Sequence, residues 1–248
     1  ISGYTDNGFV NEALSCYDLM QAEGTSPDAT TFISVVKACG LTGSINRGRE
    51  VHLLAVKKGF EDNPYVFKVL IDMYAKCASL IDAHYLFLRL DSRDLIVWSA
   101  IIAGYARQGE TRVVFQLFEQ MKVDGVDPDG VILLSILSAC NHGGFVAIGQ
   151  RIFGVMIEEY CISLDIEHHN CMIDLLGRAG QLGKAIAWLP FQPNCVTWSS
   201  ILGACQKWSN RELGQRVFEL ASNSISQDSD AFYLMYNIYA DDTEYDRS

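Results

Sequence analysis

The sequence predicts an all-α fold, an α-solenoid of helix-turn-helix repeats, because three sets of positions recur along the chain. Small residues recur at spacings of 35, 35, 31, 35, 36 and 29 residues: Gly8, Gly43, Ala78, Gly109, Gly144, Gly180 and Ser209. Five positions later comes a second, mostly small set: Ala13, Gly48, Ala83, Val114, Gly149, Ala185 and Gly214. Four positions further on comes a bulky set: Tyr17, His52, Phe87, Phe118, Phe153, Leu189 and Phe218. Such a period is typical of stacked units that bury their apolar faces against one another.

The unit 95–129 shows most clearly why each repeat is expected to be a helix pair. Its first half places apolar residues at the spacing of one helix face: Trp98, Ile101, Ile102 and Tyr105. After the break at Gly109, its second half repeats that spacing: Val114, Leu117, Phe118 and Met121. Gly125 and Pro128 then end the second helix. The small second-set residue is expected to let the two helices approach closely.

Composition supports a stacked core and does not exclude nucleic-acid binding. Of the 248 residues, 49% are apolar, and the net charge is −11. Residues 1–28 hold five acids and no base, and residues 228–248 hold six acids and one Arg. The body between them carries 19 acids and 18 bases. Because the body is nearly neutral, the overall charge says nothing about a local basic stripe.

The eight cysteines are predicted to be small, buried, reduced thiols. Cys39, Cys140 and Cys205 each close an Ala-Cys pair at the end of a helical run. There is no Cys-x-x-Cys pair in the sequence, so a four-thiolate zinc site has no support.

Enzymatic motifs are missing from the sequence. It contains no Gly-rich phosphate loop, His-Glu-x-x-His or nucleophile elbow. His168 and His169 are predicted to be structural or surface residues, since adjacent helix residues do not face one ligand. We therefore expect no catalytic residue, cofactor or metal in this chain.

The sequence contains no apolar stretch long enough to span a bilayer, so no membrane partner is predicted. The first residues, Ile1-Ser2-Gly3-Tyr4, align with Ile102-Ala103-Gly104-Tyr105 inside a complete unit. We interpret the chain as a fragment whose targeting segment would lie upstream.

The units alternate in length and motif. Residues 29–63 carry Lys37-Ala38-Cys39 and Gly48-Arg49-Glu50-Val51-His52, and residues 64–94 carry Leu70-Ile71-Asp72-Met73-Tyr74-Ala75-Lys76-Cys77. Residues 166–194 carry Cys171-Met172-Ile173-Asp174-Leu175-Leu176-Gly177-Arg178-Ala179-Gly180. These motifs resemble the PLS subclass of the pentatricopeptide repeat family of plant organelles. The resemblance assigns P-type units to 1–28 (truncated) and 95–129, L-type units to 29–63 and 130–165, and S-type units to 64–94 and 166–194.

Residues 195–248 resemble the E motifs that follow such an array of 1–194. They contain Val196-Thr197-Trp198, Gly203-Ala204-Cys205 and Tyr236-Asn237-Ile238-Tyr239-Ala240, and end before a second E motif is complete. In the preceding unit, the second helix is expected to be about three residues short, because Ala185–Leu189 runs directly into Pro190. The family's solenoid is a right-handed superhelix, and we expect the same here.

The resemblance implies binding of single-stranded RNA, one base per repeat, read by the fifth and last residues of a unit. Ser99 with Asp129 would favour guanine, and Asn170 with Asn194 a pyrimidine. Lys68 with Asp94 departs from the family's code, since Lys is a flexible point charge. The L-type pairs, Ile33 with Asn63 and Leu134 with Asp165, are expected to space the array, and Ser199 begins a further reader without a clear partner. The alternative is that the Asp and Asn residues only cap helices.

A line of cationic residues supports the RNA interpretation. Eight positions after the reader, five consecutive units carry a base or His: Lys76, Arg107, His142, Arg178 and Lys207. Asp6 and Leu41 interrupt the series in the first two units. We expect these cations, called the cationic ridge below, to contact RNA phosphates. Solvated helix C-termini would also favour cations, which is the alternative.

The predicted function is a sequence-specific RNA-binding protein of the mitochondrion or chloroplast, a specificity factor for C-to-U RNA editing. The sequence lacks the His-x-Glu and Pro-Cys-x-x-Cys motifs of zinc deaminases, so the chemistry would come from elsewhere. A deaminase-bearing or other editing-complex protein would bind through the E region. The alternative is a protein-binding adaptor solenoid without RNA readout.

Overall fold

The computed structural model describes residues 1–224, in which the regular secondary structure is all helical, without a β-strand. The all-α solenoid predicted from the sequence is therefore confirmed. The chain divides into two compact units, Ile1–Pro128 and Asp129–Ser248. The first unit consists of α1 (Ser2–Asp6), α2 (Val10–Ala22), α3 (Ala29–Thr42), α4 (Ile45–Lys57), α5 (Pro64–Lys76), α6 (Leu80–Arg89), α7 (Leu95–Arg107) and α8 (Thr111–Val123).

The described part of the second unit continues the same alternation of helices. It consists of α9 (Gly130–Gly143), α10 (Val146–Glu158), α11 (Ile166–Arg178), α12 (Leu182–Ala187), α13 (Cys195–Lys207) and α14 (Arg211–Ser224). The predicted motif Tyr236–Ala240 lies outside the described residues.

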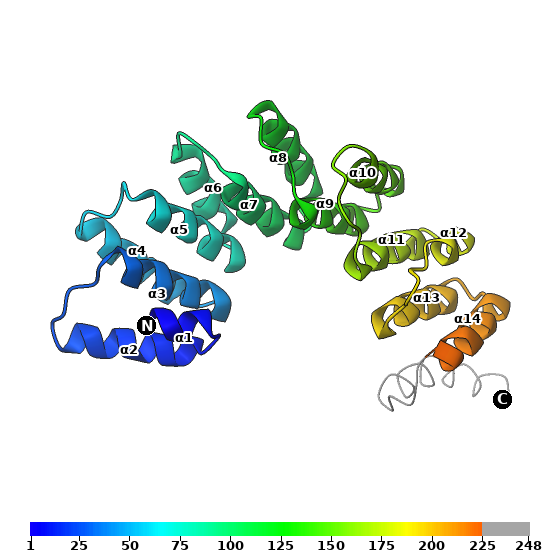
Figure 1. The fold of residues 1–248 in the computed structure, drawn as a ribbon, viewed down its shortest axis with the longest axis horizontal. Coiled ribbons are helices and arrows are strands. Elements are labelled where there is room, and N and C mark those ends of the chain that lie inside the picture. Colours follow the sequence, from blue (N-terminus) through cyan, green and yellow to red (C-terminus); the bar gives the residue numbers. More distant parts are fainter. Residues whose placement is uncertain (225–248) are drawn as a thin grey trace. The chain divides into compact units, whose positions relative to one another are not determined.

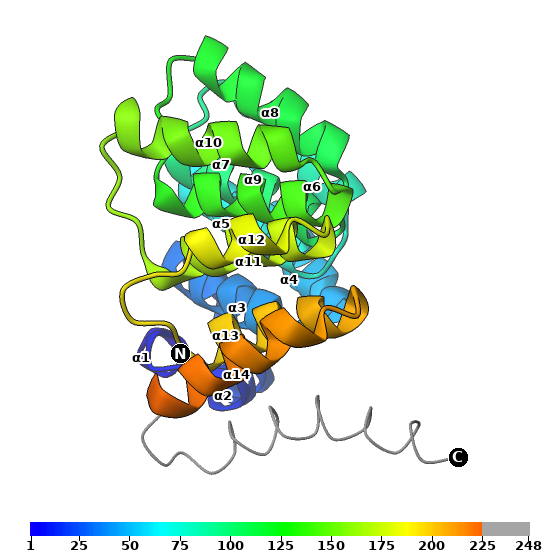
Figure 2. The same cartoon turned by 90° about the vertical axis from the view of Figure 1, so that its right-hand side faces the viewer.

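Within each unit, the odd-numbered helices stack on one another and the even-numbered helices pack against them (Figures 1 and 2). In the first unit α3 packs on α1 and α5, and α5 on α7; in the second, α11 packs on α9 and α13. The odd-numbered helices thus form one continuous layer in each unit. This layer positions the candidate site.

The turn between the helices of each pair explains the first recurring set. All seven residues of that set have a positive φ, which ranges from 51° at Ser209 to 79° at Gly8 and is 59° at Ala78. In each turn, the next residue donates its N–H to the carbonyl five positions before it, as Ser79 does to Tyr74 at 2.9 Å. This is the hydrogen bond of a Schellman cap, which requires a left-handed residue and so favours glycine.

All seven residues of the second recurring set are buried. The sequence predicted close approach of the two helices of one pair, but the atoms nearest to Gly48 and Gly149 lie on the first helix of the following pair, α5 and α11. A Cβ atom built on Gly48 would lie 2.6 Å from the sulfur of Met73, and one on Gly149 would lie 2.5 Å from Leu175. Close helix approach therefore requires a small residue at these two positions. The third set fills the groove beside it, with Phe87 and Phe153 almost fully buried.

The structure refines three further predictions. Helix α12 has six residues against ten in α6, so the second helix of this unit is shortened as predicted, by four residues where about three were expected. All eight cysteines are free, and Cys39, Cys140 and Cys205 are buried as predicted. Cys161 and Cys195 are exposed, however, because both lie at the edges of connecting segments, so the prediction of uniformly buried thiols was wrong for them. Among residues 1–224, no helix is long and apolar enough to cross a membrane.

Candidate nucleic-acid interface

The predicted readers and the cationic ridge lie on one face of the odd-numbered helices. The reader, the residue four positions later and the ridge residue fall at i, i+4 and i+8, which are neighbours along one helix face. These triplets are Lys68, Asp72 and Lys76 on α5; Asn170, Asp174 and Arg178 on α11; and Ser199, Gly203 and Lys207 on α13. A rise of 1.5 Å per residue separates reader from ridge by about 12 Å along the helix. This separation allows a base to contact the reader and a phosphate to contact the ridge residue of the same helix.

Two of the predicted reader pairs are in direct contact. The ammonium of Lys68 lies 2.6 Å from Oδ2 of Asp94. The amide nitrogen of Asn170 donates to Oδ1 of Asn194 over 3.4 Å, and the hydroxyl of Thr197 lies 2.6 Å from Oδ1 of Asn170. The fifth and last residues of these units therefore meet at one place, as recognition of a single base by two side chains requires.

The last residues of the units also cap the following helices. Oδ1 of Asp129 accepts the N–H of Ile132 over 2.9 Å, and Asp94 and Asn194 cap α7 and α13 in the same way. The capping interpretation thus describes part of their role. This cap uses Oδ1 of Asp129 and leaves Oδ2 out of the capping hydrogen bond. Ser99 lies half-buried on α7 in the first unit, and Asp129 precedes α9 in the second.

All five residues of the cationic ridge are exposed, each in the last turn of its helix. Two of them are paired with the carboxylate four positions earlier: Lys76 with Asp72 at 2.6 Å, and Arg178 with Asp174 at 3.0 Å. Arg107 donates to the carbonyl of Ala75 over 3.3 Å. A phosphate bound at Lys76 or Arg178 would either share the cation with the paired carboxylate or displace that carboxylate. These two residues therefore contribute less to phosphate binding than an unpaired cation would.

One cavity brings a predicted reader and two ridge residues together. It measures about 360 Å³ and opens between α11 and α13, lined by Asp174, Gly177, Arg178, Ser199, Ser200, Gly203, Ala204 and Lys207. A Cβ on Gly203 would meet nothing within 4 Å, so the missing side chain leaves the space open. Two hydroxyls, two cations and one carboxylate line this cavity. Such a lining suits a ligand that carries both polar edges and negative charge.

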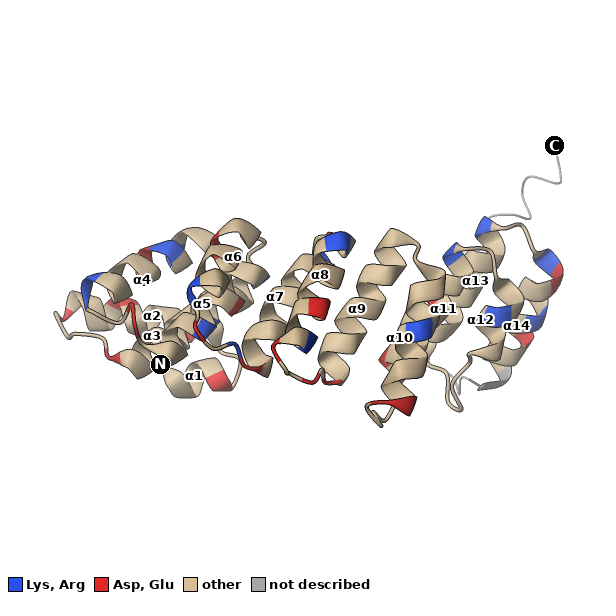
Figure 3. Cartoon of the chain, turned by 90° about the horizontal axis from the view of Figure 1, so that it is seen from above, with Lys and Arg blue, Asp and Glu red and all other residues tan. Residues whose placement is uncertain are grey.

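The first helices of the L-type units differ from the others. Ile33 and Leu134 are half-buried apolar residues at the reader position. Helix α9 carries no Lys, Arg, Asp or Glu along its length (Figure 3). These helices offer no charged reader, in keeping with the expected spacing role, which stays a prediction.

The structure exposes a set of residues that sequence reasoning missed. One turn before the reader, four units present an apolar side chain to solvent: Tyr65 (67% exposed), Ile96 (66%), Val131 (59%) and Val196 (57%). Tyr65, Ile96 and Val196 precede polar readers, whereas Val131 precedes the apolar Leu134. Apolar and aromatic surfaces beside polar readers are suited to contact the faces of bases. Their fixed position, three residues before each reader, could have identified them in the sequence, where they otherwise look like ordinary apolar residues of a helix.

His168 and His169 have separate structural partners, as predicted. His168 is buried, and its Nδ1 lies 2.6 Å from Oδ1 of Asp165 in a cap at the start of α11. Nδ1 of His169 lies 3.0 Å from the carbonyl oxygen of Trp188.

Comparison with known proteins identifies the repeats. A family model described as PPR repeat matches residues 1–25, 96–126 and 167–189. The chain is 36% identical over 97% of its length to the chloroplastic pentatricopeptide repeat-containing protein DOT4 of Arabidopsis thaliana, and 35% identical over 97% to a mitochondrial pentatricopeptide repeat-containing protein of that plant. The chain contains pentatricopeptide repeats. It spans 28% and 34% of the length of these two relatives. Their names agree with the predicted localisation, mitochondrion or chloroplast.

Solved structures support the fold of the pentatricopeptide repeats. The pentatricopeptide repeat protein PPR10 from maize superposes with a TM-score of 0.65 at 16% identity, covering 99% of this chain and 41% of that one. A second structure of PPR10, in complex with an 18-nt psaJ RNA element, also gives a TM-score of 0.65, at 15% identity, over 99% of this chain and 43% of that one. At such identities the similarity concerns the fold alone.

Proposed function

We propose that this chain binds single-stranded RNA with sequence preference and serves as a specificity factor for organellar C-to-U RNA editing. The observation that carries the proposal is the cavity between α11 and α13, which Ser199, Arg178 and Lys207 line together. Hydroxyl groups can hydrogen-bond a base edge, and the cations can bind the adjoining phosphates. The PPR10 structure with an RNA element supports an RNA ligand for this class of solenoid.

The proposal extends to the organisation of the array. Units 1–28, 29–63, 64–94, 95–129, 130–165 and 166–194 are assigned P, L and S types in alternation, and residues 195–248 an E-type region. The direct contacts between Lys68 and Asp94, and between Asn170 and Asn194, support the pairing of fifth and last residues within a unit. In this scheme the E-type region recruits a protein that carries the deaminase, and the chain itself positions the RNA.

The test is selection from a randomised single-stranded RNA pool by the purified chain. Sequence-selective enrichment, with affinity that falls as salt rises, is the expected result. Recovery of RNA without any shared sequence would contradict base readout. A variant with Arg178→Ala and Lys207→Ala is expected to bind every selected RNA more weakly, whereas Arg112→Ala with Lys184→Ala, on the even-numbered helices α8 and α12, is the matched control.

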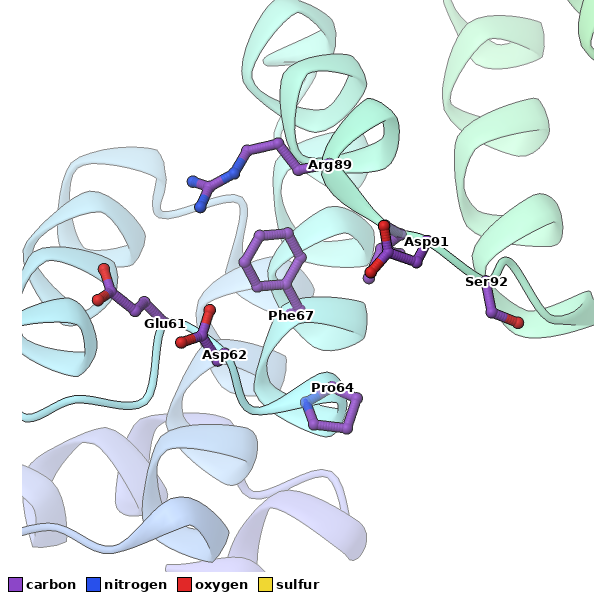
Figure 4. A pocket seen from close by; sticks show the side chains of 8 residues that line it. Glu61, Asp62, Pro64, Phe67, Arg89, Asp91 and Ser92 are labelled. Atoms are coloured by element: carbon purple, nitrogen blue, oxygen red, sulfur yellow. The ribbon is translucent and has the colours of Figure 1, made fainter.

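A protein-binding adaptor is the second candidate, and α6 carries the observation that favours it. Ile81, Tyr85 and Leu88 are 87%, 62% and 59% exposed, which is unusual for an apolar stripe on one helix face. Beside the end of α6 lies a cavity of about 340 Å³, in which Arg89 lies over the ring of Phe67, with Glu61, Asp62 and Asp91 around it (Figure 4). If Ile81→Ser with Leu88→Ser abolished function in the plant while selection of RNA stayed unchanged, the adaptor role would be supported.

A further inference from the structure

The reader pair of unit 64–94 is closed on itself by an ion pair. Lys68 lies on α5, and its ammonium is 2.6 Å from Oδ2 of Asp94, the residue before α7. Oδ1 of the same carboxylate accepts the N–H of Val97 over 3.2 Å, as the N-cap of α7. Both oxygens of Asp94 are therefore engaged within the protein.

Several contacts hold Lys68 in this position. Its side chain is only 25% exposed, and its ammonium also lies 5.8 Å from the centre of the Tyr65 ring, within the range of a cation–π interaction. Although partial burial opposes it, the hydrogen bonds from Lys68 and from the N–H of Val97 lower the pKa of Asp94 below its usual value. The pair thus consists of a cation and an anion held together, and its net charge is zero.

The other contacting pair is different in kind. Asn170 and Asn194 are neutral, and the 3.4 Å separation of their amide groups indicates a weak hydrogen bond. A base can compete with such a bond at small cost. Competing with an ammonium for the carboxylate of Asp94 costs more, because a hydrogen bond between two charged groups is about twice as strong as one between neutral groups.

We propose that Lys68 closes unit 64–94 to base selection by occupying the carboxylate of Asp94, so that the RNA nucleotide facing this unit is bound without regard to its base. The inference rests on the proposed RNA-binding function. In this state the ammonium has further N–H donors, and every base offers an acceptor to it. The unit therefore contributes attraction, and neighbouring units contribute the sequence preference.

Removing the ammonium would restore a selective reader. In Lys68→Ser, Oδ2 of Asp94 becomes an acceptor-only group next to a small hydroxyl. Guanine and uracil present a ring N–H to such a group, whereas adenine and cytosine present a ring nitrogen lone pair that it repels. Lys68→Ser should therefore prefer guanine and uracil at one nucleotide by about tenfold, within the range of a good hydrogen-bonded contact.

The experiment selects RNA from a randomised pool with the unchanged chain, then measures the affinity of each variant for four RNAs at each nucleotide of the selected sequence. The unchanged chain and Lys68→Arg, which keeps the charge, should show less than about twofold discrimination at the nucleotide concerned. Lys68→Ser and Lys68→Thr should gain about tenfold there. The double variant Lys68→Ser with Asp94→Ser keeps a capping side chain on α7 but removes the carboxylate, so it should lose the gain.

The outcomes separate this inference from the function on which it rests. If Lys68→Ser and Lys68→Thr gain no discrimination while other nucleotides remain selective, Lys68 does not close the unit, and the inference is overturned. The same holds if the unchanged chain already discriminates at that nucleotide and Lys68→Ser reduces the preference. If no nucleotide is selective in any variant, the proposed function fails first, and the inference fails with it.

Discussion

Replacing Ala78 by Gly should stabilise the first unit, because Ala78 occupies a turn position that strongly favours glycine. Its φ is 59°, and the Schellman cap it closes places the N–H of Ser79 on the carbonyl of Tyr74 at 2.9 Å. A left-handed conformation costs a residue with a Cβ roughly 1–2 kcal/mol. Glycine offsets about 0.5–1 kcal/mol of this gain, because it loses more backbone freedom than alanine on folding. The net gain in the free energy of unfolding is therefore about 0.5–1 kcal/mol.

The assay is thermal unfolding followed by circular dichroism, where this gain should raise Tm by roughly 1–4 °C for a chain of this size. Gly109→Ala is the matched control, since Gly109 has a φ of 73° in the equivalent turn and a Cβ there would meet nothing within 4 Å. It should lower Tm by a similar amount through the backbone alone. If Ala78→Gly lowered Tm and Gly109→Ala left it unchanged, the account of these turns would be refuted.

Three further predictions concern charge, thiols and pH. Replacing Lys76, Arg107 and Arg178 by Ala should weaken RNA binding equally across sequences and reduce the log–log salt slope by up to about 2; an unchanged slope would remove these residues from the interface. Added reductant should leave Tm unchanged, and a lower Tm in reductant would reveal a disulfide. A thiol reagent should modify the exposed Cys161 and Cys195 quickly. It should not modify Cys140, because burial raises the pKa of the Cys140 thiol to about 12. Burial lowers the pKa of His52 and His84, so the folded chain binds fewer protons at these side chains than the unfolded chain does. The free energy of unfolding should therefore fall as pH drops below about 6.5. If a double His52→Gln, His84→Gln variant showed the same pH dependence, the loss would belong to other groups.

The repeat pattern predicted the fold well because each recurring set has one local physical cause. Ala78 and Ser209 share a left-handed turn with five glycines, and Gly48 and Gly149 lie where a side chain would collide with the neighbouring helix. Turn geometry acts within one helix pair and the close packing acts between adjacent pairs; both recur at the repeat period, so a single sequence shows them. The exposed thiols Cys161 and Cys195 were missed because residue type alone does not place a connecting segment.

The candidate site was less predictable, since its contacts depend on how helices stack. Lys68 and Asp94 are 26 residues apart, and only the packing of α5 on α7 brings their charges together. The pairs of Lys76 with Asp72 and Arg178 with Asp174 could have been predicted, because carboxylates and cations four residues apart on a helix attract each other. These two ion pairs were not predicted, because only the cations were considered.

The central claim is that two side chains of a unit read one base, and Asp129→Asn tests it most directly. Asparagine is as good an N-cap as aspartate, so the start of α9 should stay intact. It replaces an acceptor-only carboxylate by an amide that can also donate. Affinity would be measured for four RNAs that differ at one nucleotide, before and after the substitution. The preference at that nucleotide should move from guanine towards adenine by about 1–3 kcal/mol, with the other nucleotides unaffected. An equal change for all four RNAs would contradict base readout by this unit.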